Sequence, residues 1–168
     1  MEAVSNSPGN ETTESTGGLG GKYLTFHLDN EEYGLEILKV REIINIMDIT
    51  SVPQTSDFVE GVINLRGKVI PVVDLRSKFE LSRIEYNDQT CIIVVDVGTM
   101  MGIIVDTVQE VYDIPSTNIE PPPQLGGTVD TSFILGMGKV KEDVKILLDI
   151  DKVLTSDELV PLQPVGEG

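Results

Sequence analysis

Short apolar runs separated by polar turns dominate this chain. Residues 22–28 alternate between apolar and polar side chains, which is the period of a strand with one buried face. Residues 90–97 are almost continuously apolar, which is typical of a strand covered on both faces. Segments with one of these patterns are 22–28, 31–35, 43–49, 58–65, 68–73, 90–97, 100–105, 108–114, 133–140 and 144–150. About ten short strands with turns between them predict an all-β sandwich or barrel, and periodicity alone does not separate the two.

Three short stretches depart from the strand period. The apolar positions of residues 36–44 recur at helical spacing, so a short helix is expected before the strand at 43–49. Asp74 can cap a helical turn that follows the strand at 68–73. Asp151 can cap a last helix, which is expected to end near residue 154.

The hairpin at 58–73 is the clearest single element of the pattern. Its two strands are rich in β-branched residues, and Arg66-Gly67 separates them as a tight turn, because glycine reaches positive φ without a steric cost. Pro71 has no amide proton for a ladder hydrogen bond. The return strand is therefore expected to lie at a sheet edge, or to carry a bulge at Pro71.

The two ends of the chain have a different composition from its middle. Residues 1–21 are rich in Ser, Thr, Gly and Glu and contain no basic residue, so they are expected to be disordered. Residues 159–168, with their prolines and glycines, are expected to form a flexible tail. The ordered part is therefore predicted to be a single domain within 22–158.

Charge and composition exclude several classes of function. The formal net charge of −16 argues against nucleic acid and against direct binding to an anionic membrane surface, because both demand basic residues. No apolar run approaches the ~18 residues of a membrane-spanning helix, and the N-terminus lacks the pattern of a signal peptide. These features predict a cytoplasmic protein.

Candidate catalytic residues are few. His27 is the only histidine and is predicted to lie on the surface of a strand, and Cys91, the only cysteine, is expected to pack as a small hydrophobic residue. Without a Cys/His cluster no zinc site is expected. The run Asp106-Thr107-Val108 resembles the Asp-Thr-Gly of aspartic proteases, but Val108 stands where that dyad needs glycine. We therefore expect no enzyme, no metal and no cofactor, and only modest stability losses from Asp106→Asn or Cys91→Ala.

Two long strings of residues nevertheless match a known family. Residues 32–43, EYGLEILKVREI, form one of them. The other contains Gly61, Asn64-Leu65-Arg66-Gly67, Pro71 and Asp74-Leu75-Arg76. In order and spacing the strings resemble those of the CheW-like domain, an adaptor module of bacterial chemotaxis arrays, and the resemblance extends over about 22–158.

The resemblance implies an architecture that periodicity could not supply. Members of the family fold as two SH3-like five-stranded β-barrel lobes that share an apolar interface, with short connecting helices. The last strands of the chain return to the first lobe, so the lobes are intertwined. On this expectation Ile63, Val72 and Ile93 should be buried.

The resemblance also implies a function and partners. Such a domain is a non-enzymatic adaptor that links the cytoplasmic tips of transmembrane chemoreceptors to the regulatory domain of the chemotaxis histidine kinase. The chain would be a monomer when free and would be recruited to membrane-associated receptor arrays. An alternative is an adaptor of a related non-chemotactic array, which controls surface motility or a second messenger.

Candidate contact residues follow from the same resemblance. Those implied for the receptor are Val40, Glu42, Ile43, Arg66 and Val108. Those implied for the kinase are Gly61, Leu65 and Val69. Glu42 and Arg66 lie beside apolar runs, and the planar guanidinium of arginine can bind a carboxylate through two hydrogen bonds. They are therefore expected to form an ion pair where the lobes meet.

Overall fold

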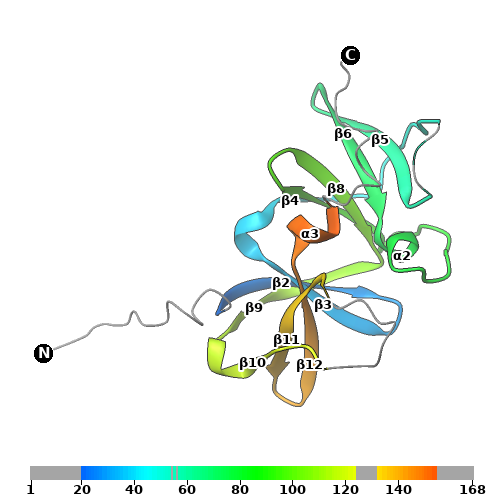
Figure 1. Cartoon of the computed structure of the whole chain (residues 1–168). Helices are drawn as coiled ribbons and strands as arrows, with labels where there is room; N and C mark the ends of the chain where they lie inside the picture. The colour runs from blue at the N-terminus through cyan, green and yellow to red at the C-terminus, as the bar shows by residue number, and fades with distance from the viewer. Residues whose placement is uncertain (1–19, 54, 56, 124–131, 155–168) are drawn as a thin grey trace, which may run out of the picture.

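The computed structural model describes residues 20–53, 55, 57–123 and 132–154, which form two β-sheets packed against each other (Figure 1). The expectations for residues 1–19 and 159–168 lie outside this part of the chain. Gly21, which was expected to belong to the N-terminal tail, already begins the first described strand and pairs with Ile114.

The first sheet has six strands within the described residues. They are β2 (Gly21–Leu28), β3 (Glu31–Glu36), β9 (Thr107–Ile114), β10 (Ile119–Glu120), β11 (Ile134–Val140) and β12 (Asp143–Leu148). Their order is β10-β11-β12-β3-β2-β9, and β12 runs parallel to β3. The last hairpin of the chain therefore returns to the first one, as expected. The two-residue strand β10 was not predicted, so this lobe has six strands instead of five.

The second sheet has five strands in the part of the chain that the structure describes. They are β4 (Val40–Asn45), β5 (Val59–Leu65), β6 (Lys68–Asp74), β7 (Cys91–Asp96) and β8 (Met100–Val105), in the order β4-β7-β8-β6-β5. After β4 the chain continues to Thr50, which forms an antiparallel bridge with Val62 of β5. This bridge connects the two edges of the sheet, because Thr50 extends the path of β4 toward β5.

Short helices connect the strands. The described ones are the 3-10 turns η2 (Ile37–Lys39) and η3 (Ser116–Asn118), and the α-helices α2 (Leu75–Lys78) and α3 (Ile150–Leu154). Asp74 caps α2 as predicted, because its carboxylate accepts a hydrogen bond of 2.9 Å from the amide of Arg76. None of the helices within the described residues is long and apolar enough to cross a membrane.

A shared apolar core joins the sheets. It contains Leu24, Phe26 and Leu28 from the first sheet, Ile93, Val95 and Ile103 from the second, and Val153 from α3. The second sheet also has a core of its own, which includes Ile63 and Val72. Ile63, Val72 and Ile93 are at most 2% exposed, so their predicted burial is confirmed. The continuous run in β7 explains this packing, since Ile92 and Val94 face the second core while Ile93 and Val95 face the shared one.

Three local expectations are wrong. The predicted helix at 36–44 is only a single 3-10 turn, and the strand predicted at 43–49 begins earlier because Val40 already pairs with Val95. Strand β6 is not an edge strand, since it lies between β8 and β5. The sheet tolerates Pro71 because the parallel pairing with β8 begins only at Val72.

The capping residue of α3 also differs from the prediction. The carboxylate of Asp149, rather than that of Asp151, accepts a hydrogen bond of 3.3 Å from the amide of Lys152. Asp151 instead binds the ammonium group of Lys39 at 2.6 Å. This ion pair attaches α3 to the η2 turn, and no local sequence pattern contains it because 112 residues separate the two partners.

Candidate functional site

Glu42 and Arg66 form the predicted ion pair, but both partners belong to elements of the second sheet, so the pair does not bridge the two sheets as expected. Nη1 of Arg66 donates a hydrogen bond of 3.2 Å to Oε2 of Glu42, and Nη2 donates a second one to Oε1. The pair joins edge strand β4 to the turn of the β5–β6 hairpin. The side chain of Arg66 is 69% exposed and that of Glu42 is 32% exposed, so the pair lies on a surface that another protein can reach.

The turn that carries Arg66 is held by its own backbone and by one side chain. Arg66 has a φ of 52° and Gly67 a φ of 87°, the left-handed conformations of a tight hairpin turn. Oδ1 of Asn64 accepts a hydrogen bond of 2.9 Å from the amide of Gly67. These contacts place the guanidinium group of Arg66 beside Glu42 before any partner binds.

The pair remains charged near neutral pH. Hydrogen bonds from Arg66 lower the pKa of Glu42 from its ordinary value, and this effect exceeds the opposing effect of desolvation. The same hydrogen bonds raise the pKa of Arg66. The site therefore presents a preorganised pair of opposite charges on the surface.

The apolar residues expected at the receptor face lie in two different settings. Val40 and Val108 are half-buried and pack against the shared core, so they lie where the two sheets meet. Ile43 is 43% exposed and lies on the same strand as Glu42. Successive side chains of a strand point to opposite faces, so Ile43 is exposed on the face of β4 opposite Glu42. The two valines lie at the border of the shared core.

The three residues expected at the kinase face also differ from one another. Val69 is 69% exposed near the tip of the hairpin, and Leu65 is half-buried against the second core. Gly61 is buried, with a φ of 147°. A Cβ atom on Gly61 would lie only 2.0 Å from the carbonyl oxygen of Thr50, so this glycine permits the bridge that connects the sheet edges.

Comparisons with known proteins agree with this arrangement. The family model of the CheW-like domain matches residues 22–158. The chain belongs to the CheW-like domain family.

Relatives of this CheW-like domain are similar over most of their length. Chemotaxis protein CheW of Klebsiella aerogenes is 39% identical over 89% of this chain and 90% of its own. Chemotaxis protein CheW of Bacillus subtilis is 34% identical over 79% of this chain and 84% of its own. The crystal structure of the scaffolding protein TtCheW from Thermoanaerobacter tengcongensis matches 83% of this chain and 96% of its own, with a TM-score of 0.76 and 38% identity. The CheW-like domain described here is therefore an adaptor of chemotaxis signalling.

A buried ionic cluster in this CheW-like domain was not anticipated from the sequence. The side chain of Arg76 is only 8% exposed. Its Nε and Nη2 atoms each donate a hydrogen bond of 2.8 Å to the carboxylate of Asp106. Nη2 also lies 3.3 Å from Asp29, and Nη1 donates to the carbonyl oxygen of Ser82. The cluster thus ties α2 and the loop after it to the turns that follow β2 and β8.

The cluster changes the interpretation of Asp106. Burial tends to raise the pKa of Asp106, but the hydrogen bonds from Arg76 and from the amide of Asp29 hold it below its ordinary value. The carboxylate is thus ionised and fully engaged, which is the opposite of a proton-sharing protease dyad. In the sequence, Arg76 was noted only because Asp74-Leu75-Arg76 is part of the family resemblance. Its pairing with Asp106 could not be predicted from local sequence, because the two residues are 30 positions apart.

The remaining candidates for chemistry are placed as follows. Cys91 is half-buried and packs against the shared core, where burial raises the pKa of its thiol, in keeping with a packing role. Nε2 of His27 lies 3.1 Å from Glu32 in a position that is 30% exposed. Within the described ranges, no group of three or more acidic, histidine or cysteine side chains could hold a metal ion.

A second buried cation was also missed by the sequence analysis. Lys145 of β12 is 3% exposed, forms an ion pair with Glu32 and lies 5.1 Å from the ring centre of Tyr112. Burial lowers the pKa of Lys145. The strand pattern predicted that β12 would be present but not that this lysine would be covered, because the residues that cover it come from β3 and β9.

Proposed function

We propose that this chain couples chemoreceptors to the chemotaxis histidine kinase by binding both, without catalysing a reaction itself. The observation that carries the proposal is the Glu42–Arg66 pair, a preorganised and exposed charge pair that joins β4 to the β5–β6 turn. The same strand, β4, also exposes the apolar side chain of Ile43. Exposed apolar side chains and preorganised charges on one edge strand are typical of a binding surface.

The receptor face is proposed to comprise Val40, Glu42, Ile43, Arg66 and Val108. The helical tip of a receptor would bury Ile43 and the exposed edges of the two valines, while its polar side chains meet the ion pair. Support comes from Val40 and Val108, which pack against the shared core and so give this part of the face a rigid base. Desolvated apolar anchors on rigid elements contribute most of the free energy at such interfaces.

The kinase face is proposed to lie on the β5–β6 hairpin, with Val69 and Leu65 as its apolar contacts. Val69 is among the most exposed large apolar side chains of the described residues. Gly61 would contribute through the backbone that it shapes, since it is itself buried. Two separate faces allow heterologous contacts that can close into rings, and many weak contacts within a membrane-associated array reinforce one another.

Separate binding assays test the coupling proposal. The full chain should capture a purified chemoreceptor cytoplasmic tip and, independently, the regulatory domain of a chemotaxis histidine kinase. Val69→Asp should weaken capture of the kinase domain by roughly tenfold or more, since an apolar anchor is replaced by a charge. Capture of the receptor tip should be unchanged. Failure to capture either purified partner would contradict the proposal.

A double-mutant cycle tests whether Glu42 and Arg66 act as one unit. Each single alanine variant, and the double variant, should bind the receptor tip roughly tenfold more weakly than the wild type, because breaking the pair from either side removes the same arrangement. The melting temperature should hardly change, since exposed ion pairs contribute little to stability. Lys22→Ala, which breaks the exposed pair with Asp113, is the matched control and should leave binding unchanged.

The cycle has two outcomes that would contradict a joint role. Strictly additive losses in binding would show that the two side chains act separately. A change in melting temperature large enough to account for the whole binding defect would show that the pair serves the fold rather than the partner.

A further inference from the structure

An exposed leucine lies on the η2 turn, two residues before Val40 of the proposed receptor face. Leu38 is 86% exposed, the highest exposure of any large apolar side chain within the described residues. A solitary exposed leucine is ordinary on a protein surface. This one, however, lies between two hollows, and its surroundings make it a candidate anchor point.

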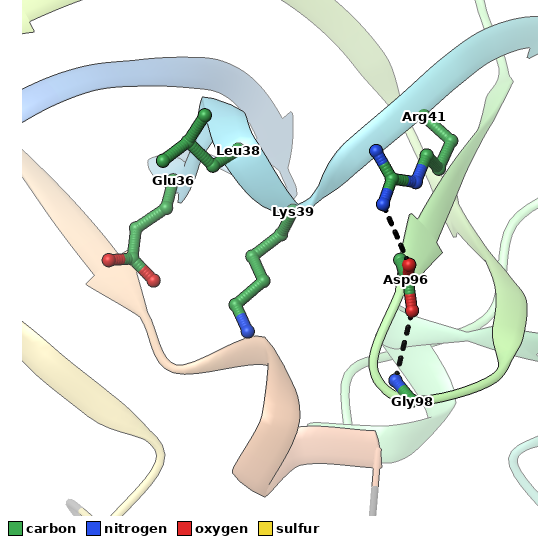
Figure 2. Close-up of a pocket in the computed structure, with 6 residues that line it drawn as sticks. All are labelled: Glu36, Leu38, Lys39, Arg41, Asp96 and Gly98. Atoms are coloured by element: carbon green, nitrogen blue, oxygen red, sulfur yellow. Dashed lines mark hydrogen bonds and ion pairs between the residues drawn. The ribbon is translucent and has the colours of Figure 1, made fainter.

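The two hollows share a wall formed by η2 and the residue before it. The first has a volume of about 430 Å³ and is lined by Glu36, Leu38, Lys39, Arg41, Asp96 and Gly98 (Figure 2). The second, of about 280 Å³, shares Glu36 and Leu38 and runs along the start of β2, from Gly20 to Tyr23. An incoming chain could thus place side chains on both sides of Leu38.

The charged side chains around the first hollow differ in whether they have a partner of opposite charge. Lys39 binds Asp151 at 2.6 Å and Arg41 binds Asp96 at 2.8 Å, so both cations of the hollow already have an anionic partner. In Figure 2 the ammonium group of Lys39 is directed toward α3, whereas no interaction is drawn to Glu36. The carboxylate of Glu36 has no hydrogen bond or ion pair with any residue that the structure describes.

Glu36 is also partly withdrawn from water. Desolvation raises the pKa of Glu36, the nearby Lys39 opposes this effect, and the charges of Asp149 and Asp151 add to it. A carboxylate that has lost water without gaining a partner would be stabilised by a cation supplied from outside. A second copy of this chain is an unsuitable source, because the copies would each carry a formal net charge of −16.

We propose that the Leu38 surface, defined as Leu38 with its two flanking hollows, docks a partner segment in which an apolar side chain lies next to a lysine or arginine. The apolar side chain packs against Leu38 and enters a hollow. The cation pairs with Glu36. None of the residues of the Leu38 surface belongs to the proposed receptor or kinase face, although it adjoins the receptor face at Val40, so it is a further contact surface for a basic partner.

The test uses the ¹⁵N-labelled full chain and two synthetic peptides. One is a short peptide of leucine, lysine and glycine, and the other has glutamate in place of each lysine. The lysine peptide should shift the amide signals of residues 36–39 and of Gly98, and the glutamate peptide should not. Glu36→Gln and Leu38→Ser should each weaken binding of the lysine peptide by roughly tenfold, through loss of a charge-assisted contact and of apolar contact.

Matched controls separate this surface from general attraction to an acidic protein. Glu142→Gln removes an exposed charge and Val144→Ser an apolar side chain that is 48% exposed, both at the β11–β12 hairpin, and neither should change binding. Equal weakening by Glu142→Gln, equal binding of the glutamate peptide, or no binding of the lysine peptide would each overturn the proposal. So would a dimer in sedimentation equilibrium that Leu38→Ser dissociates. Neither receptor nor kinase enters the assay, so its failure leaves the coupling proposal intact.

Discussion

Replacing Asp106 by asparagine is expected to lower the free energy of unfolding by about 3 kcal/mol, the lower end of the range for breaking a buried ion pair from one side. The variant would leave the guanidinium group of Arg76, whose side chain is 8% exposed, with only the exposed Asp29 as an ionic partner. The sequence analysis expected a modest loss from this substitution. The contacts of Arg76 instead predict a severe loss of stability.

Urea denaturation of the full chain measures this effect. Asp113→Asn is the matched control, because the same chemical change there removes only an exposed pair with Lys22 and should alter the unfolding midpoint very little. Arg76→Met combined with Asp106→Leu should recover much of the lost stability, since apolar residues can replace a buried ion pair. Equal midpoints for Asp106→Asn and Asp113→Asn would show that the cluster does not stabilise the fold.

The Asp106 pair also predicts a dependence on pH. The folded-state pKa of Asp106 lies below its ordinary value, so its contribution to stability is present above about pH 4 and is lost as the pH falls through the lower, folded value. Stability of the wild type should therefore fall more steeply with acid than that of Asp106→Asn. Parallel pH profiles for the two proteins would contradict this assignment.

Replacing Gly61 by alanine is the second substitution with a large expected effect, a loss of roughly 3 kcal/mol in unfolding free energy. The new Cβ atom would lie 2.0 Å from the carbonyl oxygen of Thr50. To avoid it, the chain must give up the two hydrogen bonds of 2.9 Å between Thr50 and Val62, which connect the edges of the second sheet. Backbone strain at a φ of 147° adds to this cost.

The matched control for Gly61 lies in the first sheet. Gly21 has nearly the same φ, 145°, but a Cβ atom there would meet nothing within 4 Å. Gly21→Ala therefore reports backbone strain alone and should lower the melting temperature much less than Gly61→Ala. If both variants melt at the same temperature, the contact with Thr50 has no role. Any kinase-binding defect of Gly61→Ala should be judged against this loss of stability.

Local sequence predicted most of the strands and the turn that carries the proposed site. Arg66-Gly67 was correctly interpreted as a hairpin turn because glycine at positive φ is a local requirement. The run at 90–97 correctly predicted a strand covered on both faces, since its apolar residues are consecutive. The Glu42–Arg66 pair was predicted too, but the partners lie 24 residues apart, and the family resemblance rather than spacing connected them.

The sequence alone therefore predicted most of the strands, the turn at Arg66-Gly67, the excess of acidic charge and the family of this protein. Which polar groups are buried together, and which charged groups lack a partner among the described residues, follows from the packing of the two sheets instead. Arg76 meets Asp106 and Asp29 because segments distant in sequence are brought together there, and Glu36 lines a hollow without forming a hydrogen bond or ion pair to any described residue. Such contacts depend on how the two sheets close and pack. The period of apolar residues along a strand predicts which face is buried but not how the sheets are arranged.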